Sequence, residues 1–155
     1  MNMSPQKQQK GMVDIAGKAI TKRRAVASAS VIFTKRSFAD LMHGRSPKGD
    51  VFEIARLAGI MAAKNTANLI PMCHPLELTK VRVDFDVHKK THAVIVIAEV
   101  ECLGRTGVEM EALTSASVAG LTIYDMMKWS DKGITIKDVK LTHKSGGKSG
   151  DYNIR

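Results

Sequence analysis

The sequence predicts an α+β fold in which helices pack on one face of an antiparallel sheet. Strand-like and helix-like segments do not alternate in the regular order that a parallel sheet requires. Two strand patterns, 81–88 and 93–103, are joined by a short polar turn, which indicates an antiparallel hairpin. Two helical patterns, 51–65 and 109–128, are long enough to cover one face of the sheet.

The first part of the chain should form a strand followed by a short helix. Residues 23–33 are small and β-branched, which is typical of a strand. Thr34 is expected to cap a helix that ends near His43, with Gly44 as its left-handed stop.

The next helix is expected to have Asp50 as its N-cap and to end near Asn65, because two prolines follow. Its helical spacing predicts one buried apolar face. That face comprises Val51, Ile54, Ala55, Ala58, Met61 and Ala62.

The second half of the chain holds the hairpin, the 109–128 helix, a turn at 131–133 and a last strand at 134–141. In the first hairpin strand apolar residues alternate with polar ones, so one face of this strand should be exposed to solvent. The Gly/Ser/Lys-rich tail from about 142 is expected to be mobile unless a ligand orders it.

Length and composition indicate a single domain preceded by a polar, disordered arm at 1–10. No apolar run approaches the ~20 residues needed to cross a bilayer, and the polar start does not look like a secretory signal. Two cysteines, Cys73 and Cys102, could form one disulfide at most. We therefore expect a cytoplasmic protein without a membrane partner.

The formal net charge of +9 points to an anionic partner. Nucleic acid, an anionic membrane and a small polyanion such as a triphosphate would all suit it, and charge alone does not choose among them. A nucleic-acid-binding module should carry stacking aromatic residues beside its basic ones. With four Phe, two Tyr and one Trp, the chain provides no paired platform, so this class is the alternative rather than the first choice.

The first candidate site is the loop that Pro71 and Pro75 bracket. The prolines should hold Cys73 and His74 in fixed orientations, and His74 can exchange protons near neutral pH. Alternatively, His74 bonds the loop backbone and Cys73 is a buried small residue. No Cys-x-x-Cys or paired-His spacing supports a zinc site, so no metal is expected.

The second candidate site is at the end of the 109–128 helix, where Asp125 and Lys128 are neighbours on one face. Leu121 and Val118 place Asp125 at the edge of the apolar face. Such a pair can serve as general acid and base, or it is a surface ion pair of little energetic weight.

Two carboxylates, Glu109 and Glu111, occupy the first turn of the same helix, where they favour the helix dipole. Fourteen residues separate Glu111 from Asp125, roughly 21 Å along a helix. Either these residues contact different ends of a long ligand, or two subunits contribute to one pocket.

Phosphate binding is the third signal. Lys48 precedes a helix N-terminus, which favours anions. The tail at 143–150 looks superficially like a Walker A loop but fails the test, because Thr142 replaces the first glycine and no helix follows. The tail can still fold over phosphates as a lid, or it is a solvated terminus.

Seven short blocks occur in succession: 12–15 (Met-Val-Asp-Ile), 48–52 (Lys-Gly-Asp-Val-Phe), 63–66 (Ala-Lys-Asn-Thr), 70–76 (Ile-Pro-Met-Cys-His-Pro-Leu), 106–113 (Thr-Gly-Val-Glu-Met-Glu-Ala-Leu), 121–126 (Leu-Thr-Ile-Tyr-Asp-Met) and 144–150 (Lys-Ser-Gly-Gly-Lys-Ser-Gly). Together they strongly resemble the MoaC family of cyclic pyranopterin monophosphate synthases over roughly 11–152. Asn65 replaces a more usual basic residue of that family, which would subtract one phosphate contact.

The resemblance implies a lyase of molybdenum cofactor biosynthesis. Its substrate would be 3′,8-cyclo-7,8-dihydroguanosine 5′-triphosphate, and its products cyclic pyranopterin monophosphate and pyrophosphate. It also implies ferredoxin-like subunits assembled as a hexamer, a trimer of dimers with sites at the dimer interfaces, and it names no cofactor.

The resemblance further implies roles for single residues. The catalytic group would comprise Asp125, Lys128, Lys48 and His74. The substrate-binding group would comprise Met72, Cys73, His74, Glu109, Met110, Glu111, Lys144 and Lys148. Which basic residue meets which phosphate stays open, as does the presence of Mg²⁺. The remaining alternatives are an assembly protein with a decayed pocket and an enzyme for another nucleoside triphosphate.

Overall fold

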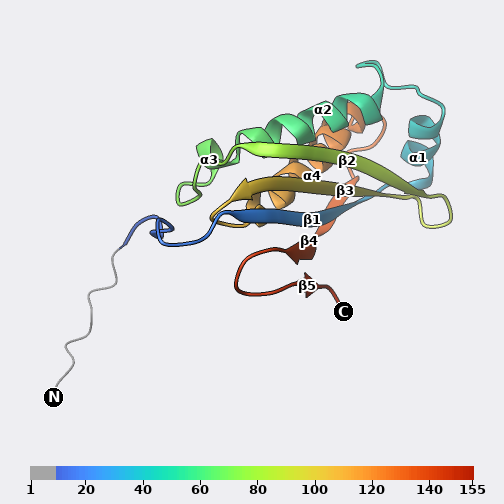
Figure 1. Ribbon diagram of the computed structural model, residues 1–155. Coiled ribbons are helices and arrows are strands. Elements are labelled where there is room, and N and C mark those ends of the chain that lie inside the picture. The colour runs from blue at the N-terminus through green and yellow to red at the C-terminus, as the bar shows by residue number, and fades with distance from the viewer. Residues whose placement is uncertain (1–9) are drawn as a thin grey trace.

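The structure is a computed structural model that describes residues 10–155 (Figure 1). The predicted N-terminal arm at 1–10 therefore lies, except for Lys10, outside the described residues.

The elements follow in the order β1 (Thr21–Ile32), α1 (Lys35–Met42), α2 (Val51–Lys64), α3 (Thr66–Leu69), β2 (Leu78–His88), β3 (Ala93–Gly104), α4 (Glu109–Met127), β4 (Thr135–Ser145) and β5 (Tyr152–Asn153). The strands form one antiparallel sheet with the order β2-β3-β1-β4-β5. The helices α1 to α3 connect β1 to the edge strand β2, and α4 connects β3 to β4 on the other side of β1. The predicted α+β, ferredoxin-like fold is confirmed, and so is the β2–β3 hairpin.

The helices α2 and α4 cover one face of the sheet, and the other face is open (Figure 1). Strand β1 alternates between these faces, so Ala25, Ala27, Ala29 and Val31 are fully buried. Small side chains on β1 let α4 approach closely, and they explain a core built with few aromatic residues.

The predicted caps are confirmed. The Thr34 side chain accepts a hydrogen bond from the Ser37 amide at 3.2 Å and begins α1. The Asp50 carboxylate accepts one from the Glu53 amide at 3.0 Å and begins α2. Gly44 has a φ of +62°, the left-handed conformation expected of the residue that stops α1.

The predicted buried face of α2 is partly wrong. Val51, Ala55 and Ala62 are buried as expected, but Ile54 and Met61 are 43% and 61% exposed. The helix is apolar on more than one side, so its pattern fits several rotations. The structure selects the rotation that places Ala55, Gly59, Ala62 and Ala63 inside, because small residues permit close packing against α4.

The last strand is longer than predicted. β4 continues past Leu141 to Ser145, and β5 pairs with its end through His143↔Asn153 and Lys144↔Tyr152. The beginning of the predicted tail is therefore part of the sheet. Its mobility in the absence of a ligand stays a prediction.

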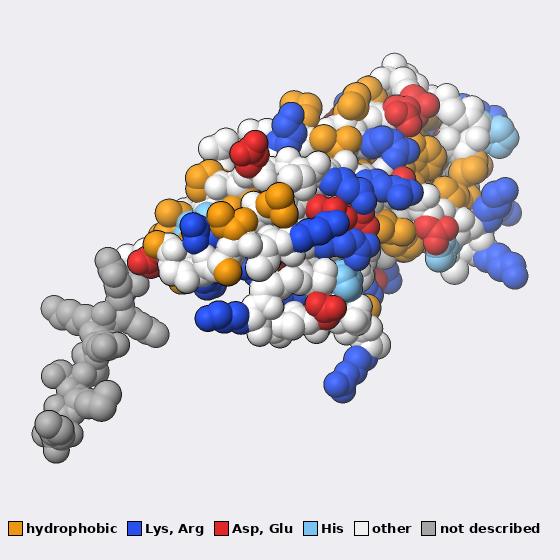
Figure 2. Space-filling model, viewed as in Figure 1, with side chains coloured by type: hydrophobic (Ala, Val, Ile, Leu, Met, Phe, Trp, Pro, Cys, Tyr) orange, Lys and Arg blue, Asp and Glu red, His pale blue; other side chains and the backbone are white. Residues whose placement is uncertain are grey.

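The open face of the sheet carries basic and acidic side chains mixed at its centre (Figure 2). Glu99 and Glu101 on β3 form ion pairs with Lys22, Arg24 and Lys80. These basic residues are engaged by glutamates, so this surface gives no support to the nucleic-acid alternative.

Candidate active site

The predicted site residues fall into two groups at opposite ends of α4. The first group lies at the N-terminal end of the helix and lines a cavity of about 360 Å³. It includes the predicted residues Met72, Cys73, His74, Glu109, Met110 and Glu111, together with Val13, Ile15, Lys18, Leu76, Thr106 and Gly107.

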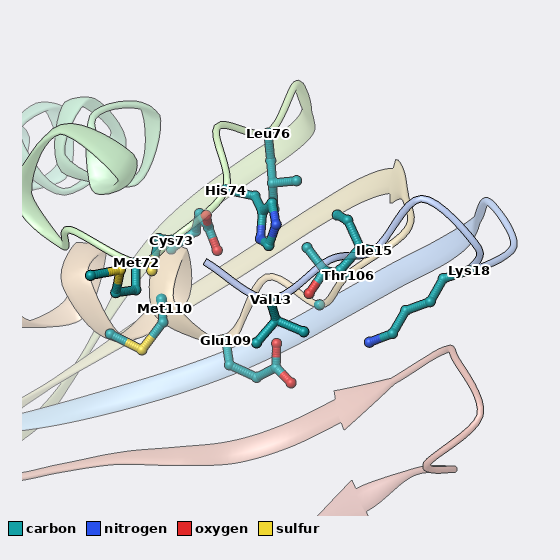
Figure 3. Close-up of a pocket in the computed structure, with 12 residues that line it drawn as sticks. Val13, Ile15, Lys18, Met72, Cys73, His74, Leu76, Thr106, Glu109 and Met110 are labelled. Atoms are coloured by element: carbon teal, nitrogen blue, oxygen red, sulfur yellow. The ribbon is translucent and has the colours of Figure 1, made fainter. Parts of the chain in front are cut away.

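The segment before β1, the loop before β2, the β3–α4 loop and the first turn of α4 form this cavity (Figure 3). His74 and Leu76 enter it from the loop before β2, while Val13 and Glu109 lie on the opposite side. The loop leaves α3 through a turn in which the Cys73 amide donates to the Ile70 carbonyl at 3.1 Å. The turn and the flanking prolines hold the half-buried His74 at the cavity wall.

Glu111 is the most buried acidic residue of the cavity, with an exposed fraction of 4%. Burial raises its pKa, the nearby Glu109 charge raises it further, and a hydrogen bond from its own backbone opposes the shift. Burial and the Glu111 charge likewise raise the pKa of the Cys73 thiol. The cavity thus favours a protonated thiol and a carboxyl that holds its proton to higher pH than usual, as a general acid requires.

Glu109 is held by Lys144, which reaches from β4 to the first turn of α4 and donates a hydrogen bond to its carboxylate. Gly107 makes this placement possible, since a Cβ atom there would lie 2.0 Å from Glu109 Oε2. The predicted substrate residues Glu109 and Lys144 are therefore direct partners.

One wall of the cavity comes from the segment before β1, which has little regular structure of its own. Arg105 fixes it by donating hydrogen bonds to the carbonyls of Ala16, at 3.2 Å, and of Lys18. Val13, Ile15 and Lys18 face the cavity from this segment. The sequence analysis did not identify this wall.

A second cavity of about 230 Å³ adjoins the first, because Lys18 lines both. Its other lining residues are Ala19, Thr21, Arg23, Gly147, Lys148 and Ser149. Three cationic side chains therefore surround a small space, and the predicted Lys148 is one of them. The buried Thr21 hydroxyl in its wall has no hydrogen-bond partner within residues 10–155.

Arg23 was missed by the sequence analysis. It is 9% exposed and donates from Nε to the Gly104 carbonyl at 3.2 Å. A Cβ atom at Gly147 would lie 1.9 Å from Arg23 Nη1, so the glycine-rich loop packs against the guanidinium. A signal was available: Arg23 shares the inward face of β1 with Ala25 and Ala27, and an arginine at such a position needs a partner.

The second group lies at the C-terminal end of α4 and comprises Lys48, Asp125 and Lys128. Lys48 Nζ is 2.6 Å from Asp125 Oδ2, and Lys128 Nζ is 2.7 Å from Asp125 Oδ1. The hydrogen bonds from Lys128 and Lys48 lower the pKa of Asp125 to about 2, and the bond to Asp125 raises the pKa of Lys128. All three side chains are about half exposed, so the cluster presents two ammonium groups and one carboxylate to a ligand.

The Lys48 loop is held against α4. The Ser46 hydroxyl donates to the Met126 carbonyl at 2.8 Å, and the Lys48 amide donates to Ser46 Oγ at 3.3 Å. Gly49 follows with a φ of +105°, a conformation that L side chains rarely adopt. Lys48 is thereby directed to Asp125.

The two groups are not brought together within one chain. Glu111 and Asp125 are fourteen residues apart on the uninterrupted helix α4, which separates them by about 21 Å. Within residues 10–155, no cluster of three or more His, Cys, Asp or Glu side chains could hold a metal ion. None of the helices in that part of the chain combines the length and apolar character needed to cross a bilayer.

Comparison with known proteins identifies relatives over nearly the whole chain. Cyclic pyranopterin monophosphate synthase of Parvibaculum lavamentivorans is 52% identical over 144 residues, which cover 93% of this chain and 90% of the relative. The proteins of that name from Geobacter metallireducens and Desulforapulum autotrophicum are each 55% identical, over 91% of this chain and 88% and 86% of their own lengths. A sequence model of the MoaC family matches residues 12–147. The match spans both ends of α4 and all residues that line the first cavity, and the chain belongs to the MoaC family.

Proposed function

We propose that this protein is a cyclic pyranopterin monophosphate synthase of molybdenum cofactor biosynthesis. It converts 3′,8-cyclo-7,8-dihydroguanosine 5′-triphosphate to cyclic pyranopterin monophosphate and releases pyrophosphate. Relatives that are 52–55% identical carry this name. The structural observation that carries the proposal is the pair of adjoining cavities that share Lys18. One offers groups for proton transfer and the other offers cations for phosphates.

The guanine-derived ring occupies the first cavity. Met72 and Met110 provide apolar, polarisable surface for a flat ring, and both are exposed in the free chain. Glu111 and His74 lie where they can exchange protons with ring nitrogens, which the opening and reclosing of the ring require.

The triphosphate occupies the second cavity, where Lys18, Arg23 and Lys148 supply positive charge. The planar guanidinium of Arg23 suits a phosphate, because it can donate two parallel hydrogen bonds. When the substrate binds, the Lys144 ammonium either leaves Glu109 for a phosphate oxygen or donates hydrogen bonds to both. Its carboxylate partner keeps the lysine extended toward the substrate before binding.

The last chemical change is closure of the cyclic phosphate. A sugar hydroxyl oxygen attacks the α-phosphorus, the bond from that phosphorus to the bridging oxygen breaks, and pyrophosphate leaves with the electron pair. A base takes the hydroxyl proton. Cations around the leaving group stabilise the charge that develops on it.

The active site is completed by a second subunit, which contributes the Lys48–Asp125–Lys128 cluster. The ~21 Å between the two ends of α4 is too long for the reacting part of one nucleotide to contact both within a single chain. A hexamer built as a trimer of dimers would supply such interfaces. Since its substrate derives from a nucleoside triphosphate, we place the reaction in the cytoplasm.

Subunit mixing tests the shared site. Glu111→Gln and Asp125→Asn are each expected to inactivate every site when alone. In mixed dimers one of the two sites regains both intact halves, so random mixing should restore about a quarter of the wild-type rate. Pyrophosphate release and pterin fluorescence should return together. If the wild-type protein turns over the substrate but the mixture of the two variants regains no activity, the shared site is contradicted. A folded wild type that forms neither product would contradict the proposed function.

A further inference from the structure

We propose that Asp40 is a positioning residue. It fixes the Lys48 loop relative to the end of α4, so that Lys48 and Lys128 both contact Asp125. The inference rests on the proposed catalytic role of the Lys48–Asp125–Lys128 cluster. Asp40 itself lies on α1, outside that cluster.

Asp40 joins two segments that are far apart in the sequence. Its Oδ2 accepts a hydrogen bond from the Ser130 hydroxyl at 2.6 Å, and its Oδ1 accepts one from Arg45 Nη1 at 3.0 Å. Its backbone carbonyl accepts a further bond from the Arg45 amide at 3.1 Å. One residue thus binds both the loop after α1 and the turn after α4.

Both lysines of the cluster lie within three residues of these contacts. Lys48 follows Arg45 by three residues, and between them Ser46 is bonded to the Met126 carbonyl. Lys128 precedes Ser130 by two residues. A residue spans at most about 3.6 Å of chain, so two fixed points this close leave each lysine backbone little freedom.

The burial of Asp40 supports a role in positioning rather than in packing alone. It is 8% exposed, and an ionised carboxylate loses favourable hydration at such a position. The Ser130 and Arg45 hydrogen bonds and the charges of Arg45 and Arg36 lower the pKa of this carboxyl below its ordinary value. Asp40 therefore stays ionised wherever the enzyme is assayed, and its two acceptor oxygens remain available to both segments.

The test compares Asp40→Asn and the milder Ser130→Ala with two controls. Val83→Ala opens the core beneath α2 and serves as a stability-matched variant, since Val83 is 1% exposed. Asp84→Asn removes a carboxylate on β2 that likewise pairs with arginines, Arg56 of α2 and Arg82 of β2. The measurements are kcat, KM, the melting temperature and hydrogen exchange of the amides at 44–49.

Asp40→Asn is expected to lower kcat by ~10- to 100-fold with KM nearly unchanged, because small displacements of reacting groups are costly. Amide exchange at 44–49 should accelerate, and Ser130→Ala should change both quantities in the same direction by less. Val83→Ala should lower the melting temperature at unchanged kcat, and Asp84→Asn should leave kcat unchanged.

Two results would overturn the positioning role. One is wild-type kcat and wild-type exchange at 44–49 in Asp40→Asn. The other is a loss of kcat no larger than that of Val83→Ala at a matched melting temperature. Asp125→Asn separates this inference from the proposed function. If that variant turns over normally, the catalytic role of the cluster fails, and the exchange data still decide whether Asp40 orders the loop.

Discussion

Gly59 on α2 lies so close to Ser115 on α4 that a Cβ atom at Gly59 would be 3.2 Å from both the carbonyl and the hydroxyl oxygen of Ser115. The same Cβ would lie 3.1 Å from a methyl group of Val83 on β2. The two helices therefore touch almost backbone to backbone, above the sheet. This contact sets how α4 lies, and α4 carries a group of site residues at each end.

Gly59→Ala should destabilise the protein by ~1–3 kcal/mol through overpacking, although alanine is intrinsically the better helix residue. Denaturant unfolding measures the change. Gly120→Ala on α4 is the matched control, because its Cβ would lie 3.4 Å from the nearest atom, a methyl of Ile136. That control should be neutral or gain up to ~1 kcal/mol. Equal stabilisation of both variants would contradict the tight contact at Gly59.

Ser115→Ala should be neutral or stabilising by ~1 kcal/mol, because the Ser115 hydroxyl is fully buried and has no hydrogen-bond partner within residues 10–155. Ser37→Ala is the comparison, since the equally buried Ser37 hydroxyl is bonded to Thr34. The Ser37 variant should lose stability in the same unfolding experiment. A larger loss at Ser115 than at Ser37 would show that the Ser115 hydroxyl has a partner after all.

Glu111→Gln should raise the melting temperature more at neutral pH than at about pH 4. Burial raises the folded-state pKa of Glu111 above its ordinary 4.5, so the folded protein binds more protons than the unfolded chain above that pH. Stability is then lost as pH rises from about 4.5 through the raised pKa, and glutamine lacks this loss. Thermal unfolding across pH checks the sign, and a difference that grows toward acid would refute it.

Asp125→Asn should keep the fold and lower turnover by ~10³-fold or more. Because the pKa of Asp125 is about 2, its carboxylate is fully charged at any practical assay pH. The acid limb of the kcat/KM profile should therefore arise from another group. The stabilisation from the two lysine bonds is present above the ordinary value of 3.8 and is lost as pH falls through about 2. Near-wild-type turnover of Asp125→Asn would remove its catalytic role.

Lys148→Ala should raise KM for the triphosphate substrate by ~10-fold with a smaller effect on kcat, because it removes one of three cations from the second cavity. Lys137→Ala provides the control: this exposed lysine on β4 lies 3.8 Å from Asp138 and lines neither cavity. The effect should weaken at high salt. An unchanged KM for Lys148→Ala would exclude Lys148 from phosphate binding.

Local chemistry made much of this fold predictable. Thr34, Asp50 and Gly44 have side chains or backbone freedom suited to helix ends, and each ends or begins a helix as expected. The β2–β3 hairpin follows from an alternating strand, a polar turn and an apolar strand. The rotation of α2 was not predictable in this way, because Ile54 and Met61 are as apolar as the small residues that the structure buries instead.

The site was predictable where the residues lie in one short segment and unpredictable where distant segments meet. Lys128 and Asp125 are neighbours on one helix, and their ion pair follows from spacing alone. The Lys48 contact with Asp125 depends on how a loop crosses α4, which no local pattern encodes. The contributions of Lys18 and Arg105 depend likewise on where the segment before β1 lies.

The glycine-rich tail shows why a motif can mislead a sequence scan. Its resemblance to a nucleotide-binding loop suggests that the glycines exist to approach phosphates. In the structure Gly147 has a φ of +82°, and its missing side chain leaves the space that Arg23 Nη1 occupies. Two effects therefore act against a side chain at position 147: the positive φ strains any L residue, and a Cβ atom would displace the Arg23 guanidinium. In a deep mutational scan, substitutions at 147 should therefore remain costly even in a background where residue 23 is shortened.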